Sequence, residues 1–228
     1  NGYCKNASVA KNLVTDCKLN AIDVRNYSNG SVISENRICR SGENAVNVSK
    51  NISNVMVKNN MVEGSNGNGI RVSEAKRVTV LGNRLQSLKR HGVFGLTVSR
   101  LKISGNTMQN VRQMAVSLVD AKKSNTASIE ATKIKRVTQK TKKKKKTVKI
   151  KGMGNKGSSY TVMVGNKKYK AIVRGNRFLV KKSGTIRQGT KITVWEKTSG
   201  GNQIITEKQV KAPVKKQGKK QGKKRTKK

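Results

Sequence analysis

The sequence predicts an all-β protein with three parts: a solenoid of about 5–6 coils, a small C-terminal β-sandwich and a disordered basic tail. Three observations lead to this fold class. Segments of the first half repeat at a fixed spacing, their apolar residues alternate with polar ones, and short turn sequences divide the second half. Alternation with a period of two is typical of strands, whereas a helix needs an apolar residue at every third or fourth position.

The repeat is marked by an asparagine that recurs every 23 or 24 residues. These residues are Asn12, Asn36, Asn60, Asn83 and Asn106. A second set of small residues keeps the same spacing, at Ala21, Ala45, Gly69, Gly92 and Ala115. A degenerate sixth copy begins at Ala127 and carries Thr132 in the asparagine position. Two sets in phase over five copies indicate a true repeat.

Each copy has room for three short strands and three turns, at about 3.3 Å per strand residue. Coils that stack about 4.8 Å apart bring equivalent residues into register, which predicts two inward stacks of aliphatic side chains. Their members are Ile33, Val57, Val80 and Ile103 in one stack and Ile22, Val46, Ile70, Val93 and Val116 in the other. The recurring asparagine tolerates a left-handed φ at the bend, and its amide is expected to bond to the neighbouring coils in a ladder.

The repeat also resembles that of a known family. The segment G-I-x-V, a turn and then V-x-V-x-x-N-x-[LIM] resemble the right-handed parallel β-helix repeat of the pectate-lyase-like superfamily, over about residues 6–136. The resemblance implies that the recurring asparagines form the family's asparagine ladder. It also implies that the G-I-x-V strand belongs to the sheet that lines the substrate groove. The superfamily includes polysaccharide lyases, polygalacturonases, phage tailspikes and non-catalytic surface proteins.

The second half contains six strand candidates separated by Gly-Asn, Gly-Thr and Gly-Gly-Asn turns. They cover residues 147–151, 160–164, 168–173, 177–182, 191–196 and 204–210. This part resembles the small bacterial Ig-like domains of Gram-positive surface proteins, and Trp195 would lie in or near its core. The predicted domains are a β-helix over 1–138, a lysine-rich linker over 139–146, an Ig-like β-sandwich over 147–211 and a disordered basic tail over 212–228.

The chain carries a strong positive charge, with 52 Lys+Arg against 10 Asp+Glu and a formal net charge of +42. Residues 1–136 hold 22 and 8 of these (22 − 8 = +14), and residues 137–228 hold 30 and 2 (30 − 2 = +28). Lysine runs repel and stay solvated, and they bind nucleic acid only non-specifically without aromatic residues for base stacking. A run of about 18 apolar residues is missing, so we predict no transmembrane segment.

The three cysteines, Cys4, Cys17 and Cys39, all lie in the first forty residues. An odd number without a C-x-x-C spacing favours neither a disulfide framework nor a zinc site. Two alternatives stay open, a bridge between Cys17 and Cys39 in neighbouring coils or buried free thiols. We predict no metal and no cofactor, because a calcium site needs several carboxylate oxygens and the outward face offers only Asp23, with Asp120 nearby in the chain.

The middle residue of each G-I-x-V strand points outward, because its apolar neighbours face the core. The predicted substrate-binding residues are Asp23, Arg25, Asn47, Arg71, Phe94 and Ser117. Phe94 would stack on a sugar ring, Arg25 and Arg71 would bind carboxylates, and the amide and hydroxyl groups would bond to sugar hydroxyls. Ser49 and Ser73 occupy the next outward positions.

A lyase reaction needs a base for the sugar C5 proton and a cation for the uronate carboxylate. The catalytic candidates are Lys89, Arg90, His91 and Arg71. His91, however, occupies the same repeat position as Asn20, Asn44 and Asn68, which favours a structural role in a second ladder. An outward arginine is most often simply solvated.

Three functions follow from these observations. The first is an exported, cell-surface carbohydrate-active protein that acts on or binds an anionic polysaccharide or cell-wall polymer. We expect this chain to be the C-terminal part of a longer, secreted protein. With further coils before Asn1, that protein would be a lyase or a glycoside hydrolase. The alternative is a non-catalytic surface or adhesin protein, and the third is non-specific nucleic-acid binding through the lysine runs. We expect a monomer.

Overall fold

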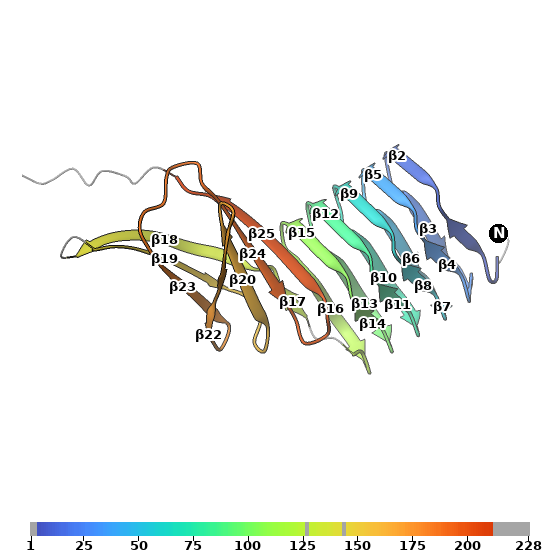
Figure 1. The fold of residues 1–228 in the computed structure, drawn as a ribbon. Helices are drawn as coiled ribbons and strands as arrows, with labels where there is room; N and C mark the ends of the chain where they lie inside the picture. Colours follow the sequence, from blue (N-terminus) through green and yellow to red (C-terminus); the bar gives the residue numbers. More distant parts are fainter. Residues whose placement is uncertain (1–3, 126–127, 143–144, 212–228) are drawn as a thin grey trace, which may run out of the picture.

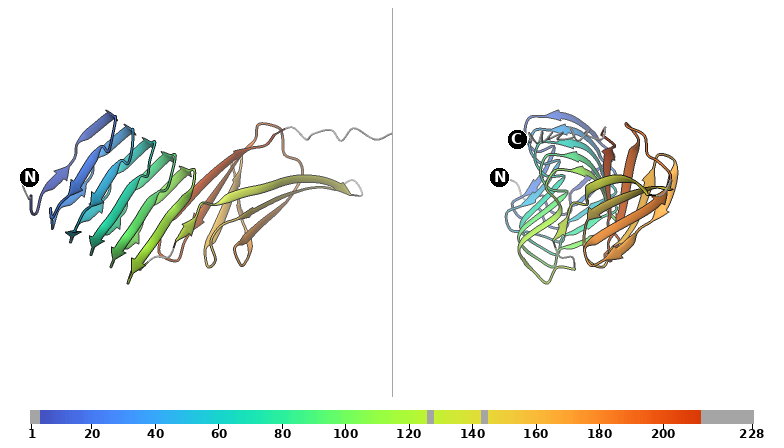
Figure 2. Two further views of the ribbon diagram at one scale, coloured as in Figure 1. Left: turned by 180° about the vertical axis from the view of Figure 1, so that it is seen from behind. Right: turned by 90° about the vertical axis from the view of Figure 1, so that its left-hand side faces the viewer.

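The computed structural model describes residues 4–125, 128–142 and 145–211. Every element within these residues is a strand, and the strands form a solenoid followed by two C-terminal layers (Figures 1 and 2). Within the described ranges, no helix is long and apolar enough to cross a membrane. The predicted basic tail, 212–228, lies outside the described residues.

Three parallel sheets run along the solenoid. Sheet A contains β1 (Ser8–Ala10), β4 (Val32–Ser34), β8 (Met56–Lys58), β11 (Thr79–Leu81) and β14 (Lys102–Ser104). Sheet B begins with β2 (Leu13–Cys17), β5 (Arg37–Ser41), β9 (Met61–Ser65), β12 (Arg84–Leu88) and β15 (Thr107–Val111). Sheet C contains β3 (Ile22–Arg25), β6 (Val46–Ser49), β10 (Ile70–Lys76), β13 (Val93–Ser99) and β16 (Met114–Lys122), with β7 (Ile52–Ser53) beside β10 and β17 (Ile129–Glu130) antiparallel to β16.

The core of the solenoid consists of aliphatic stacks that run from coil to coil. In sheet A, Ile33 lies opposite Val57, which lies opposite Val80. In sheet C, Ile22 lies opposite Val46, and the same row continues to Val116. All members of the two predicted stacks are buried. Parallel coils place the same kind of side chain at the same height in each layer, so the interior is filled without large rings.

An asparagine ladder follows one turn of every coil. Nδ2 of Asn60 donates to Oδ1 of Asn83 (3.0 Å) and to the Ile33 carbonyl (2.9 Å), while Oδ1 of Asn60 accepts bonds from N and Nδ2 of Asn36. The same pattern joins all five asparagines of the repeat: Asn12, Asn36, Asn60, Asn83 and Asn106. Buried amides that satisfy one another in this way hold the turns of successive coils in register.

The left-handed residue of this turn is the one before the ladder asparagine. Lys11, Glu35 and Asn59 have φ values of 58°, 57° and 56°, and Gly82 and Gly105 have 66°. The prediction that the ladder asparagine itself takes a left-handed φ is therefore wrong. The preceding residue makes the bend, and the asparagine side chain is then directed into the core, where it meets the adjacent coils.

The last coil is closed by a strand from the end of the chain. N and Nδ2 of Asn106 donate to Oδ1 of Asn202 at 3.2 and 3.1 Å, and β25 (Gln203–Gln209) then pairs in parallel with β15. Asn202 is thus the next member of the ladder. The predicted sixth copy, with Thr132 in the asparagine position, is wrong because Thr132 instead donates to the buried carboxyl of Glu196.

Beyond the solenoid, the chain forms two antiparallel layers that share an apolar core. Sheet B continues through β25 into β24 (Lys191–Lys197), β20 (Ser159–Val164) and β21 (Lys167–Lys170). Sheet D contains β18 (Lys133–Lys142), β19 (Lys145–Met153), β23 (Arg177–Ser183) and β22 (Ile172–Arg174). Val148, Ile150, Val162, Phe178 and Val194 are buried between them.

The predicted linker over 139–146 differs from the structure. β18 and β19 pair in a hairpin that includes most of this segment, and Figure 1 shows the hairpin reaching away from the solenoid. Val137 lies opposite Ile150 and Gln139 opposite Val148. Val137, Val148 and Ile150 on the inner side of the hairpin add to the core of the two layers, and this burial outweighs the repulsion among the lysines.

All three cysteines are free thiols. Cys39 lies opposite Thr15 in sheet B, whereas Cys17 lies opposite Ser41, so the two side chains are at different positions of the register. Only Cys39 is buried, while Cys4 is exposed and Cys17 half-buried. The bridge left open by the sequence is not formed.

Candidate functional site

The outward residues of sheet C form a row across the coils. Asp23 lies opposite Asn47, Asn47 opposite Arg71, Arg71 opposite Phe94, and Phe94 opposite Ser117. Each residue comes from a separate strand, β3, β6, β10, β13 or β16, and neighbouring strands are about 4.8 Å apart. The structure thus brings five of the six predicted substrate-binding residues side by side. Arg25 lies opposite Ser49, one pleat along the strand.

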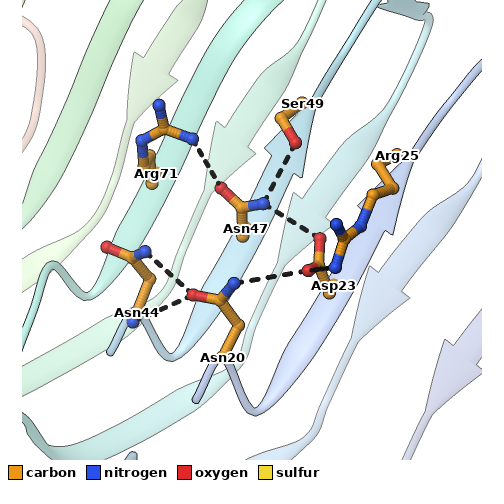
Figure 3. A network of polar contacts seen from close by, with 7 residues as sticks. All are labelled: Asn20, Asp23, Arg25, Asn44, Asn47, Ser49 and Arg71. Carbon is orange, nitrogen blue, oxygen red and sulfur yellow. Dashed lines mark hydrogen bonds and ion pairs between the residues drawn. The ribbon is translucent and has the colours of Figure 1, made fainter. Parts of the chain in front are cut away.

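A hydrogen-bond network orients the first half of this row (Figure 3). Nδ2 of Asn47 donates to Oδ1 of Asp23 (2.9 Å) and to Oγ of Ser49 (3.0 Å), and Nη1 of Arg71 donates to Oδ1 of Asn47 (3.1 Å). Arg25 forms an ion pair with Asp23. Both oxygens of Asp23 are thus engaged, whereas Arg71 uses one guanidinium nitrogen and keeps donors for a ligand.

A second ladder runs along the turn that leads into sheet C. Oδ1 of Asn20 accepts bonds from N and Nδ2 of Asn44, and Oδ1 of Asn44 accepts bonds from N and Nδ2 of Asn68. Oδ1 of Asn68 accepts from the backbone N–H of His91 (3.1 Å). In the next coil, the N–H of Met114 donates to Nδ1 of His91 (3.3 Å). His91 therefore occupies a structural position in which its Nδ1 carries no proton.

The environment of His91 keeps the imidazole neutral. Burial lowers the pKa of His91 below its ordinary value of 6.5, and the positive charge of Arg90 lowers this pKa further. The imidazole ring stacks on Phe94, with centroids 5.4 Å apart. A neutral imidazole accepts the bond from Met114, and a protonated one cannot.

We expect the solenoid to become less stable at acid pH, because protonation of His91 breaks its bond from the Met114 N–H. The pKa of His91 is lower in the folded protein than in the unfolded chain. The stabilisation that neutral His91 provides is therefore fully present above pH 6.5 and is lost as the pH falls towards the folded-state pKa. The variant His91→Asn places at this position the asparagine that the preceding coils carry, and it has no group that titrates in this pH range. Between pH 7.5 and 5.0 we expect the Tm of the wild type to fall further than that of the variant. Equal losses in the two proteins, measured by thermal unfolding, would contradict this role.

A groove with a volume of about 380 Å³ lies along the second ladder and the row of sheet C. Its polar and aromatic lining residues are Asn20, Glu43, Asn44, Asn47, Asn66, Asn68, Arg71, Arg90 and Phe94. Gly42 and Gly67 complete the lining. A Cβ at Gly42 would lie 2.0 Å from the Lys18 carbonyl oxygen, so glycine allows the turns to approach closely here. The groove thus offers amides, two guanidinium groups, one carboxyl group and one aromatic ring.

The four catalytic candidates are only partly brought together, and His91 reaches the groove only through its stacking on Phe94. Arg71 and Arg90 line the groove, but Lys89 lines a neighbouring hollow of about 610 Å³ together with Asp16 and Arg40. There, Nε of Arg40 bonds to Oδ1 of Asp16 (2.5 Å) and Nη2 to Oδ2 (2.6 Å), and Arg40 holds the pKa of Asp16 below its ordinary value. His91 is held in the second ladder by its backbone N–H and Nδ1.

Sequence reasoning missed part of the groove. Asn66 and Glu43 line it, and the asparagines of the second ladder line it as well as holding the coils together. The sequence signal for this was the polar turn before each G-I-x-V strand, which reads G-E-N in one copy and N-G-N in the next. Among the residues that the structure describes, no three His, Cys, Asp or Glu side chains are grouped to hold a metal.

Two comparisons with known proteins bear on the identity of the chain. A search of curated proteins gives no match. Residues 2–135, more than half of the chain, match the family described as right-handed β-helix region. This segment contains β1 to β17, the first ladder from Asn12 to Asn106, and the second ladder from Asn20 to Met114. The chain therefore belongs to the right-handed β-helix family.

Proposed function

We propose that this protein binds an anionic polysaccharide in the groove beside sheet C and that it does so at the cell surface. The observation that supports this most directly is the lining of the groove, where Arg71 and Arg90 lie among asparagine amides and beside Phe94. A sugar polymer with carboxylate groups has partners for each of these. Guanidinium groups bind carboxylates, amides bond to hydroxyls, and an aromatic ring packs on the C–H face of a sugar.

The shape of the site suits a chain of sugars better than a small ligand. The groove and the row of sheet C run across several coils, so equivalent polar groups recur at the stacking distance of the coils. A repeating surface of this kind fits a repeating ligand. The engagement of Asp23 by Arg25 and Asn47 keeps its negative charge away from an anionic chain.

Binding without turnover is the interpretation that the side chains favour. Among the residues predicted from the sequence, Nδ1 of His91 is engaged in the ladder, both oxygens of Asp23 are engaged, and Lys89 lines a separate hollow. Glu43 is the one carboxyl group in the lining of the groove, whereas glycoside hydrolysis needs two. A general base needs a free acceptor within reach of the proton that it removes. We therefore propose the non-catalytic alternative, a surface or adhesin protein, before the lyase or glycoside hydrolase.

The resemblance of the C-terminal layers to domains of surface proteins supports a location at the cell envelope. Their turn-divided strands are similar to the bacterial Ig-like domains of Gram-positive surface proteins, and we propose that they belong to that class. Export and surface attachment would follow. The positive charge of this half would also attract anionic wall polymers in a salt-dependent manner.

The test is retention of the protein on immobilised polygalacturonate and alginate, measured at several salt concentrations. We expect Arg71→Ala to weaken binding roughly 5- to 10-fold, because one guanidinium–carboxylate contact is lost. The matched control is Arg84→Ala, which removes an exposed arginine from β12 in sheet B. Equal binding by the two variants, or no retention of the wild type, would contradict the proposal. Absorbance near 235 nm, followed in parallel, would reveal unsaturated products if the protein were a lyase instead.

A further inference from the structure

The outward face of sheet D carries a second concentration of positive charge, far from the groove on sheet C. Side chains of β18, β19, β22 and β23 that point away from the core are mostly cationic. They are Arg136, Lys149, Lys151, Arg174, Arg177 and Lys181. The inner face of the same strands holds Ile150, Phe178 and Val180, which are buried. Alternation along the strands thus separates an apolar inner face from a cationic outer face.

The cations of this face lie directly opposite one another. Arg136 pairs with Lys151, Lys149 with Lys181, and Arg174 with Arg177 in the register of the sheet. Like charges directly opposite on neighbouring strands destabilise a sheet. Three such pairs on one face are an arrangement that folding alone does not favour.

No carboxylate within the described residues offsets these charges. Residues 131–228 contain only two acidic residues, Glu196 and Glu207. Glu196 is fully buried, and Glu207 bonds to Lys191 at 2.8 Å. None of the six outward cations forms an ion pair among the residues that the structure describes. The counter-charge for this face must therefore come from outside the chain.

The face is also hollowed and partly apolar. A groove of about 850 Å³ is lined by Lys135 and by most of these cations, and between them lie Met153, Leu179 and Ile172. Ile172 is 54% exposed. Gly152 faces inward between Lys151 and Met153, where a Cβ would lie 2.1 Å from the buried Phe178 ring. The only aromatic residue of the lining is Phe178, which is buried and stacks on Tyr160.

We propose that the outward face of sheet D is a second binding surface and that its ligand is an acidic polysaccharide. The cations provide partners for carboxylate or sulfate groups, and the exposed aliphatic side chains provide contacts for the C–H faces of sugar rings. A single-stranded nucleic acid would find no exposed aromatic ring in the lining of this groove on which to stack its bases, and a duplex would offer the cations only its phosphates. A bound polyanion would also remove the repulsion within the three opposed pairs.

The experiment compares two variants of equal net charge. K151Q/R174Q/R177Q removes cations from the groove of sheet D, and K167Q/K168Q/K170Q removes three exposed lysines from β21 on the other layer. We expect the first to weaken binding to polygalacturonate roughly 10-fold or more and the second to change it less than about 2-fold. We also expect the sheet D variant to be at least as stable as the wild type, since two opposed pairs are relieved.

The outcomes separate this surface from the groove on sheet C. If K151Q/R174Q/R177Q loses binding and Arg71→Ala still binds like the wild type, the surface on sheet D is supported even though the proposed groove beside sheet C is not. Equal effects of the two triple variants would overturn the inference, because attraction would then depend on net charge alone. Tighter binding of a duplex DNA than of polygalacturonate, with the same loss in the sheet D variant, would assign the face to nucleic acid and overturn it as well.

Discussion

Replacing Glu196 by alanine is expected to lower the free energy of unfolding by about 3–5 kcal/mol. Four donors converge on the carboxyl group of this fully buried residue in β24. They are the Thr132 hydroxyl, N and Nδ2 of Asn155 at 2.8 and 2.9 Å, and the Tyr160 hydroxyl at 3.0 Å. The variant removes this shared acceptor from the Thr132 hydroxyl and from N and Nδ2 of Asn155, while the Tyr160 hydroxyl keeps the Asn155 carbonyl at 2.8 Å. In a thermal melt, the loss corresponds to a fall in Tm of roughly 10–15 °C.

The position of Glu196 explains why the effect is large. Thr132 precedes β18, Asn155 lies between β19 and β20, and Tyr160 is in β20, so one side chain joins three segments. Burial, and next the charge of Glu196, raise the pKa of Tyr160, which keeps the phenol protonated as a donor. Glu196→Gln should recover only part of the stability, because its amide nitrogen cannot accept a bond.

The matched control is Glu207→Ala in the neighbouring strand β25. Glu207 bonds to Lys191 in a pair that is partly exposed, with side-chain exposures of 57% for the lysine and 26% for the glutamate. Pairs of this kind contribute about 0–1 kcal/mol. A loss in Glu207→Ala as large as that in Glu196→Ala would show that the effect comes from the overall charge rather than from the buried carboxyl group.

The second large effect is expected for Asn202→Ala, which should cost about 2–4 kcal/mol of stability. Asn202 is fully buried, accepts from N and Nδ2 of Asn106, and donates to the Ile103 carbonyl. Its removal takes away the acceptor of the backbone N–H of Asn106, while Nδ2 of Asn106 keeps its bonds to the Val80 and Ser104 carbonyls. The lost bonds lie at the junction of the solenoid and the C-terminal layers. We expect Tm to fall by roughly 5–10 °C, measured by thermal unfolding.

Hydrogen exchange would show where the effect of Asn202→Ala is located. Amides of β15 and β25 should lose protection first, because these strands pair directly at the junction. Asn166→Ala, in the exposed turn between β20 and β21, is the control and should leave both Tm and exchange within error. Loss of protection spread evenly over the whole chain in Asn202→Ala would contradict a local role at the junction.

The candidate site could be predicted in part because a repeat fixes which residues are neighbours. Asp23, Asn47 and Arg71 are 24 residues apart in the sequence, and one coil per repeat places them on adjacent strands. The position of His91 in a ladder was predictable for the same reason. The sequence did not reveal which outward residues bond to one another, since the engagement of Asp23 by Arg25 and Asn47 depends on side-chain directions.

The chain by itself determined the solenoid. The spacing of 23 or 24 residues sets one coil, the alternation of apolar residues selects its inner face, and the buried amides keep the coils in register. Only the tertiary structure decided how the solenoid ends. Asn202 lies 96 residues after Asn106, and no local pattern distinguishes the Gly-Asn turn before β25 from the others of that half. The lysine-rich hairpin was decided in the same way, because the burial of its inner side chains against sheet B outweighs the charge repulsion that a reading of the sequence sees first.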